Sequence, residues 1–300
     1  MRTRLRMASA VAAGMFSLML IAPFELEGQQ AHLAIAPARP LPGAIVRLSL
    51  TDAGASDAIV GVTGTMAGEP LHFAGGKGAW RAIGAVPVDS GGEVVAHVIA
   101  SRASGRTDTL SASVTPPPLP PPKEQLAVAT QFGRPMDSAT AARVEQENKR
   151  AIAVGRQSQE EPPKWTAPFR KPRASEISSR FGSGRTFNGQ VTSRHLGVDF
   201  RGAVGAPIRA ANDGVVALVD NFFLGGNVVY IDHGGGLTTG YLHLSKTLVN
   251  VGDHVTRGQI LGRVGATGRV TGPHLHWTAR YGAITVNPLD LLTLEPVNAR

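Results

Sequence analysis

The sequence contains no cysteine, and this absence excludes several kinds of chemistry at once. No thiol nucleophile, disulfide bond or cysteine-ligated zinc finger can form, and a bacterial lipoprotein anchor has no attachment point. If the chain binds zinc, its strong ligands must therefore be histidine and carboxylate side chains.

Aromatic and acidic residues are also scarce. Aromatic residues make up 5% of the chain, and 22 acidic residues stand against 30 lysines and arginines, which gives a formal net charge of +8. A basic surface attracts polyanions such as nucleic acid, anionic lipid or the acidic polymers of a bacterial wall, and charge alone does not choose among them. A basic stretch rich in aromatic residues is absent, so we expect no nucleic-acid partner.

Two further absences concern the C-terminal half. The helical zinc-peptidase motif His-Glu-x-x-His does not occur. No helical segment separates the short apolar runs at 215–219 and 228–231, which are bounded by glycine-rich turns. A parallel α/β fold needs such helices, so residues 164–300 are expected to form a compact antiparallel β domain.

The N-terminal segment has the pattern of an export signal. Arg2, Arg4 and Arg6 precede an apolar stretch from Met7 to Pro23, and no clear small-x-small cleavage site follows. The stretch is short for a membrane span. We expect residues 1–30 to be a signal peptide, or an uncleaved membrane anchor, and the protein to be exported to the periplasm, cell envelope or extracellular space.

Residues 31–115 alternate between apolar and polar residues in several short runs. The runs around Val46–Leu50, Val94–Val98 and Leu110–Val114 are separated by clusters of turn residues. Short strands with regular turn signals predict a small β-sandwich domain. His32, His72 and His97 are scattered through it, and we interpret them as structural or surface residues.

Residues 116–163 are expected to be a proline-rich and helical linker. A polyproline run at 116–122 marks the boundary. A helix is predicted from about Ala139 to Val154, with Asp137 or Ser138 capping its start and Gly155 ending it. Few large apolar residues lie on it, so it is expected on the surface. The whole chain is thus predicted to be mainly β.

The residues that indicate chemistry lie near the C-terminal end. The segments HLGVD at 195–199 and HLH at 274–276 offer imidazoles and a carboxylate to a divalent metal. His274 and His276 are two apart and would share one face of a strand, and His195 and Asp199 are four apart, which returns to one side in an extended chain. A catalytic zinc takes three such ligands and keeps one position open for water.

Several segments resemble the lysostaphin/LytM-type zinc metallopeptidases, over roughly Trp165 to Leu292. The signatures are SRHLGVDF at 193–200, YLHLS at 241–245 and GATGRVTGPHLH at 265–276. Shorter matches support them at 179–182, 231–234, 251–253, 257–259 and 287–289. One departure is visible at Thr278, where the family often has an acidic residue after an aromatic one.

The resemblance implies a fold, a cofactor and roles for five residues. The fold is a small antiparallel β domain with the metal in a groove. His195, Asp199 and His276 would hold Zn²⁺. His243 and His274 would flank the open position, one as general base and the other assisting the leaving amine or steadying the intermediate. The substrate would be the peptides of bacterial peptidoglycan, cut at stems or cross-bridges.

Other residues and one alternative function complete the expectations. Tyr241 and Arg180 are candidates for lining the substrate groove, and His233 and His254 are interpreted as structural or solvent-exposed. The alternative is a non-catalytic wall-binding or regulatory module that activates another hydrolase, as some members of this family do. Retention of all five candidate residues favours the enzyme. A membrane contact is expected only if the N-terminal segment stays uncleaved.

Overall fold

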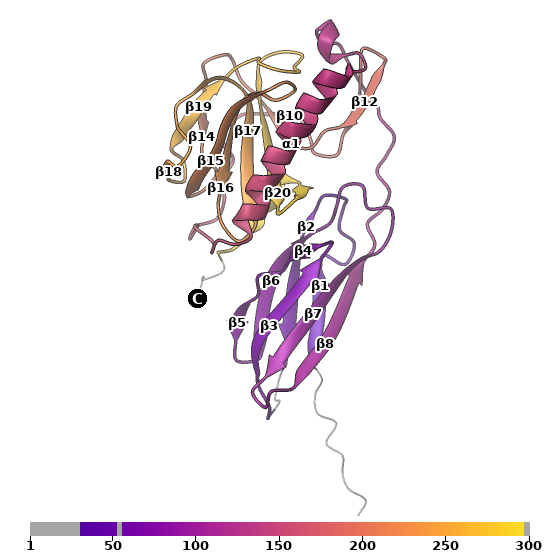
Figure 1. Ribbon diagram of the computed structural model, residues 1–300, viewed down its shortest axis with the longest axis vertical. Helices are drawn as coiled ribbons and strands as arrows, with labels where there is room; N and C mark the ends of the chain where they lie inside the picture. The colour runs from indigo at the N-terminus through magenta and orange to yellow at the C-terminus, as the bar shows by residue number, and fades with distance from the viewer. Residues whose placement is uncertain (1–30, 53–55, 297–300) are drawn as a thin grey trace, which may run out of the picture.

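The computed structural model describes residues 31–52 and 56–296 (Figure 1). The predicted signal or anchor segment, residues 1–30, lies outside the described residues. The described chain forms an N-terminal body of strands and a C-terminal body of strands with one long helix on its side. The prediction of a mainly β chain with an antiparallel C-terminal domain is confirmed.

The N-terminal body consists of two four-stranded sheets packed face to face. The alternation read from the sequence sets the buried face, because Val46, Leu48 and Leu50 point into the core while Arg47 and Ser49 are exposed. One sheet contains β1 (His32–Ala36), β2 (Ile45–Thr51), β6 (Ala79–Ala85) and β5 (Ala74–Gly76). The other contains β4 (Glu69–Pro70), β3 (Ile59–Met66), β7 (Val94–Arg102) and β8 (Thr107–Val114).

The C-terminal body is built on a ten-stranded sheet whose recorded pairings are all antiparallel. Its main path runs β10 (Ile177–Ser179), β13 (Val198–Arg201), β20 (His274–Tyr281), β17 (Leu237–Thr247), β16 (Gly226–Asp232), β15 (Gly214–Phe222) and β18 (His254–Val255). Beside this path lie β14 (Pro207–Arg209), β19 (Ile260–Val264) and β21 (Ile284–Val286), and a 3₁₀ helix η2 follows at Pro288–Thr293.

The proline-rich segment is attached to the C-terminal body through strand pairing. It ends in a short strand, β9 (Glu124–Leu126), which pairs in parallel with β11 (Gly184–Phe187), and β11 pairs with β12 (Val191–Arg194). A 3₁₀ turn, η1 (Thr130–Phe132), leads on toward the helix. No sequence pattern predicts β9, because three residues are too few to show a periodicity.

The helix α1 spans Ser138–Ser158 and differs from its prediction at the C-terminal end. Asp137 caps its start by accepting a 2.7 Å hydrogen bond from the Thr140 N–H, as expected. Gly155 does not end it. A side chain there would place its Cβ 2.0 Å from the carbonyl oxygen of Gly282, so Gly155 lets the helix approach that loop closely.

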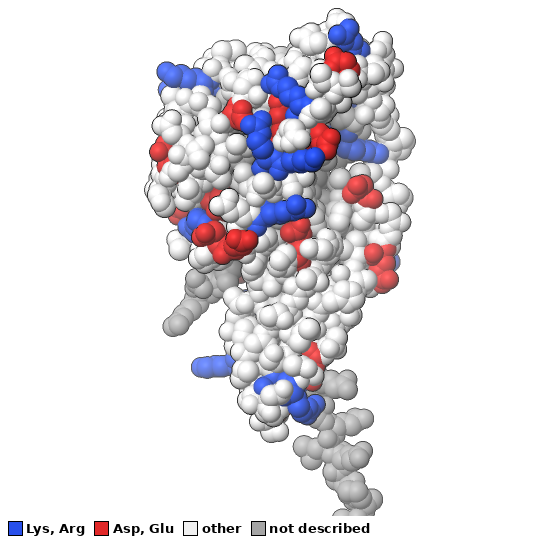
Figure 2. All heavy atoms as spheres, in the orientation of Figure 1, with Lys and Arg blue, Asp and Glu red and all other residues white. Residues whose placement is uncertain are grey.

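The helix also lies on the sheet that carries the site. Ala151 and Val154 pack against Phe222, Val228 and Tyr230 of the strands beneath. Figure 2 shows that charged side chains of both signs are interspersed on this face of the C-terminal body. No helix within the described residues is both long and apolar enough to cross a membrane.

The two bodies share buried contacts. Ile45 and Ala85 of the sandwich belong to the hydrophobic core of the C-terminal body. Buried Glu69 accepts hydrogen bonds from the Ala283 N–H at 2.9 Å and from Gln159 at 3.0 Å. Such paired polar groups and shared apolar side chains fix the sandwich against the edge of the C-terminal body.

Candidate metal centre and catalytic groove

Two neighbouring strands and the loop before one of them place the predicted ligands. β13 and β20 are antiparallel, and Asp199 lies directly opposite His276 in their register. His195 lies in the irregular segment between β12 and β13, which bends at Gly197, and not in an extended strand, which corrects the geometry expected from its spacing to Asp199. No residue with a side chain fits at position 197, because a Cβ on Gly197 would lie 2.5 Å from the His276 ring.

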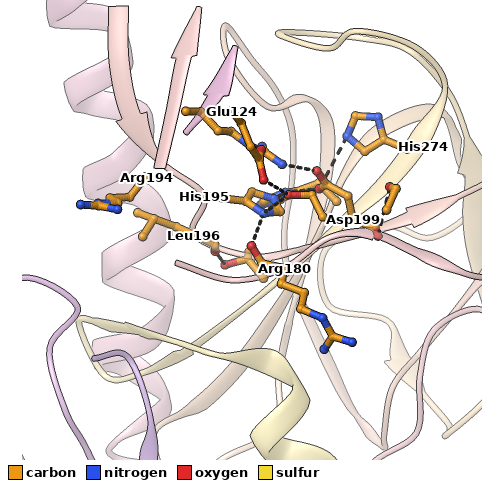
Figure 3. A network of polar contacts seen from close by, with 12 residues as sticks. Glu124, Arg180, Arg194, His195, Leu196, Asp199 and His274 are labelled. Atoms are coloured by element: carbon orange, nitrogen blue, oxygen red, sulfur yellow. Dashed lines mark hydrogen bonds and ion pairs between the residues drawn. The ribbon is translucent and has the colours of Figure 1, made fainter. Parts of the chain in front are cut away.

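The three ligand atoms converge on one point. Figure 3 shows His195 and Asp199 of this cluster, with His274 beside them. Nε2 of His195 lies 2.9 Å from Oδ1 of Asp199, and Nδ1 of His276 lies 2.8 Å from the same oxygen. The two ring nitrogens are 2.9 Å apart. Within residues 31–52 and 56–296, this is the single group of three or more histidine and acidic side chains that could hold a metal ion.

The surrounding contacts orient these ligands. The second ring nitrogen of His195, Nδ1, donates a 2.9 Å hydrogen bond to the carbonyl oxygen of Arg180, so the lone pair of Nε2 faces the centre. Arg185 donates to Oδ2 of Asp199 at 2.7 Å, which leaves Oδ1 toward the histidines. Two imidazoles and one carboxylate arranged in this way are a donor set that fits zinc.

The protonation of the ligands suits a metal. Although burial alone would raise it, the pKa of Asp199 lies below its ordinary value because the adjacent imidazoles of His195 and His276 stabilise the ionised carboxylate. Burial lowers the pKa of His276 to about 4, against the opposing effect of Asp199. At neutral pH the carboxylate is therefore ionised and the His276 imidazole is neutral, which are the forms that bind metal ions.

His243 and His274 lie beside this cluster. Nε2 of His274 is 3.6 Å from Oδ1 of Asp199, and the rings of His243 and His274 are 4.9 Å apart. In each ring Nδ1 is 2.8 Å from a backbone carbonyl, that of Thr267 for His243 and that of Gly272 for His274. When Nδ1 carries the proton, Nε2 is left free for proton transfer at the centre.

His243 occupies an uncommon backbone conformation. Its φ is +64°, in the left-handed region that non-glycine residues rarely adopt. The pairing of β16 with β17 shifts register next to it, so the strand bulges there. The bulge turns the imidazole toward the groove, and burial, with His274 and His276 adding repulsion, lowers the pKa of His243 well below its ordinary value.

The bulge also explains why the prediction for Tyr241 was wrong. Alternation along a regular strand would place Tyr241 and His243 on one face. Tyr241 is instead fully buried, and its hydroxyl accepts a 2.8 Å hydrogen bond from the Ala211 N–H. It is a core residue and does not line the groove.

The side chains of the other residues singled out in the sequence do not contribute to the metal centre. The side chain of Arg180 points away from the centre in Figure 3, and the residue contributes its carbonyl instead. His233 is fully buried between the carbonyl of Asp213 and the hydroxyl of Thr239, as a structural residue should be. His254 is exposed, as expected. Thr278, at the family's acidic position, donates to the carbonyl of Leu196 at 2.7 Å.

A cavity of about 600 Å³ adjoins the cluster, and Asp199, His243 and His274 line it. Part of its wall comes from residues that sequence reasoning missed, namely Glu124 on β9 and the arginines Arg185 and Arg269. Isolated charged residues carry no pattern that distinguishes them from surface residues. The one available signal was the position of Arg269 inside the 265–276 signature.

Comparisons with known proteins agree with this geometry. Residues 193–288 match the model of peptidase family M23. A stretch of 114 residues is 45% identical to the peptidoglycan DD-endopeptidase ShyC of Vibrio cholerae and covers 37% of this chain and 26% of that protein. A stretch of 102 residues is 41% identical to the DD-carboxypeptidase/endopeptidase Mpg of Neisseria meningitidis and covers 34% of this chain and 24% of Mpg.

One solved structure extends the likeness beyond the matched domain. A crystal structure from Pseudomonas aeruginosa, assigned by name to peptidase M23, is 28% identical with a TM-score of 0.63. The match covers 85% of this chain and 95% of that one. The curated relatives, by contrast, are matched over only about a quarter of their own length.

Proposed function

Since this chain belongs to peptidase family M23 through residues 193–288, we propose that it is a zinc-dependent endopeptidase that cuts the peptides of bacterial peptidoglycan. The convergence of His195, Asp199 and His276 on one point carries this proposal. The names of ShyC and Mpg, which describe peptidoglycan or DD-peptide cleavage, support the substrate class.

The proposed zinc ligands are His195 through Nε2, His276 through Nδ1 and Asp199 through Oδ1, since these atoms already face one another. A zinc ion held there would act as a Lewis acid that polarises the scissile carbonyl and makes a bound water more acidic.

His243 and His274 are the proposed acid and base. Each ring directs Nδ1 at a backbone carbonyl, which leaves Nε2 to accept or donate a proton. One imidazole takes the proton that the attacking water releases, and the other gives a proton to the leaving amine. The lowered pKa of His243 keeps its imidazole neutral at pH 7, which suits the proton-accepting role.

The proposed site of action is outside the cytoplasm. The three arginines and the apolar stretch within residues 1–30 support an export signal, and the positive net charge would favour contact with an anionic wall. The rival function, a regulatory module without catalysis, gains no support from the site, because all five residues are present and lie together.

The test is digestion of purified peptidoglycan sacculi by the full chain, followed by mass spectrometry of the released fragments. We expect new peptide termini that disappear with a chelator and return when zinc is added back. The identity of the new termini gives the bond that is cut. If the fragments do not change under any metal condition, while a variant lacking His243 and His276 still performs the cellular task, the regulatory function is correct.

A further inference from the structure

An arginine without a counter-ion lines the groove. Arg269 is half-buried in the loop before β20 and shares the cavity with Asp199 and His274. Among the residues that the structure describes, no acidic group pairs with its guanidinium, and the charged group that influences its pKa is another cation, Arg185. A half-buried cation that is not paired within the protein costs stability, so a role toward a ligand would explain it.

The other arginines of the groove are paired. Arg185 binds Asp199 at 2.7 Å and Glu124 at 3.0 Å. Arg201 binds Glu176 at 3.0 Å, and both partners are largely exposed. The two carboxylates that line the groove are thus engaged by Arg185, and the positive charge of Arg269 is left uncompensated.

The guanidinium of Arg269 also lies over an aromatic ring. Its Cζ is 4.1 Å from the ring centroid of Phe187, which is a cation–π contact. A guanidinium carries its N–H groups in a planar fork, so it can still bind a carboxylate through two parallel hydrogen bonds. Burial, and to a smaller extent Arg185, lowers the pKa of Arg269 to about 10, so the group is still charged at neutral pH.

We propose that Arg269 is a specificity-determining residue that binds a free carboxylate of the peptide substrate in the groove beside the catalytic histidines. This inference rests on the proposed function, because it names a chemical requirement of the same site. A peptide with a free carboxylate supplies the missing partner of Arg269, whereas an amidated peptide leaves the cation without one.

The test compares two forms of one substrate. Purified cross-linked muropeptide dimers are used as isolated and after conversion of their free carboxylates to amides with carbodiimide and ammonia. The full chain is expected to cut the free-acid form with a kcat/KM at least about tenfold higher, as a charge-assisted hydrogen bond warrants. Arg269→Gln is expected to cut both forms at similar, reduced rates, and Arg269→Lys to keep part of the preference.

Two further measurements make the result decisive. Arg106→Gln removes the same charge at an exposed position of the sandwich and is expected to keep the full preference. This control separates the effect of Arg269 from a general effect of net charge. Binding of both forms is measured in a His243→Ala background, where cutting is expected to be negligible. If the wild type cuts neither form, the proposed function fails, and the binding comparison still tests Arg269.

Two outcomes would overturn the inference. One is equal binding and equal cutting of the free-acid and amidated forms by the protein with Arg269 intact. The other is a preference for the free acid that survives unchanged in Arg269→Gln.

Discussion

Arg185 holds Asp199 from the side opposite the two histidines. Its Nη2 lies 2.7 Å from Oδ2 of Asp199, while Nε lies 3.0 Å from Glu124. Glu124 belongs to β9, the last part of the proline-rich segment. Two residues from outside the matched region 193–288, Glu124 and Arg185, therefore help to orient a residue of the metal centre.

This relationship predicts a role for the ion pair in metal affinity. The double variant Glu124→Gln/Arg185→Gln removes both charges together, so the net charge near the centre is unchanged and the loss of orientation is isolated. Changes to groups that hold metal ligands cost about 10–100-fold in affinity. We expect zinc binding to weaken by at least about tenfold, measured by competition with a chelator of known affinity.

The matched control is Glu176→Gln/Arg201→Gln, another ion pair of 3.0 Å whose two side chains are 71% and 67% exposed. Exposed pairs contribute little, so this variant should bind zinc as the wild type does. Equal zinc affinity in both double variants would show that Asp199 keeps its orientation without Arg185.

The second prediction separates metal binding from proton transfer. His276→Ala removes a ligand atom that lies 2.8 Å from Oδ1 of Asp199, so we expect bound zinc and hydrolysis to be lost together. His243→Ala should keep zinc, because this ring makes no ligand-type contact with Asp199, yet lose most hydrolysis, about 10²–10⁴-fold for a proton-transfer group. The measurements are metal content of the purified variants and release of muropeptide fragments. Full hydrolysis by zinc-loaded His243→Ala would contradict the role of His243.

The fold could be predicted from sequence wherever periodicity sets it. The alternation at Val46–Leu50 predicted β2, and the two-residue spacing of His274 and His276 fits their common position on β20. Periodicity gave the wrong result at His243, because its positive φ breaks the two-residue repeat of the strand. The side chains of His243 and Tyr241 therefore do not share a face. Contacts between distant segments, such as β9 with β11, leave no local pattern at all.

Gly155 shows the same limit in the helix. Glycine after a helical stretch normally marks the end of the helix. Here a glycine is needed within the helix, because position 155 lies too close to Gly282 for a side chain. The third prediction follows from this contact. In an isolated helix Gly→Ala would add about 1 kcal/mol of stability, whereas here the new methyl group would meet a backbone carbonyl that cannot rotate away.

Overpacking costs about 1–3 kcal/mol, which exceeds or cancels the gain in helix propensity. We therefore expect Gly155→Ala to lower the free energy of unfolding by about 1–2 kcal/mol, measured by denaturant titration. Gly91→Ala is the control, because a Cβ at Gly91 meets nothing within 4 Å. A Gly155→Ala protein more stable than the wild type would mean that the loop around Gly282 moves at little cost.

The fourth prediction concerns pH and the buried histidine outside the metal centre. Burial lowers the pKa of His233 to about 4, against the ordinary value of 6.5. Between these values the unfolded chain binds the proton and the folded chain does not, so protonation favours unfolding. The contribution of His233 to stability is complete above about pH 6.5, falls as the pH decreases, and reaches its minimum near pH 4.

The expected loss is about 1.4 kcal/mol per pH unit within this window, or about 2–3 kcal/mol between pH 7 and pH 4.5. His233→Gln keeps a donor for the carbonyl of Asp213 and has no titrating group, so its free energy of unfolding should depend less on pH by that amount. Both proteins are unfolded in urea with a chelator present, so that loss of metal at low pH does not contribute. His243 and His276 titrate in both proteins and cancel in the comparison. Parallel pH profiles for the two proteins would show that His233 is protonated in the folded state as easily as in the unfolded chain.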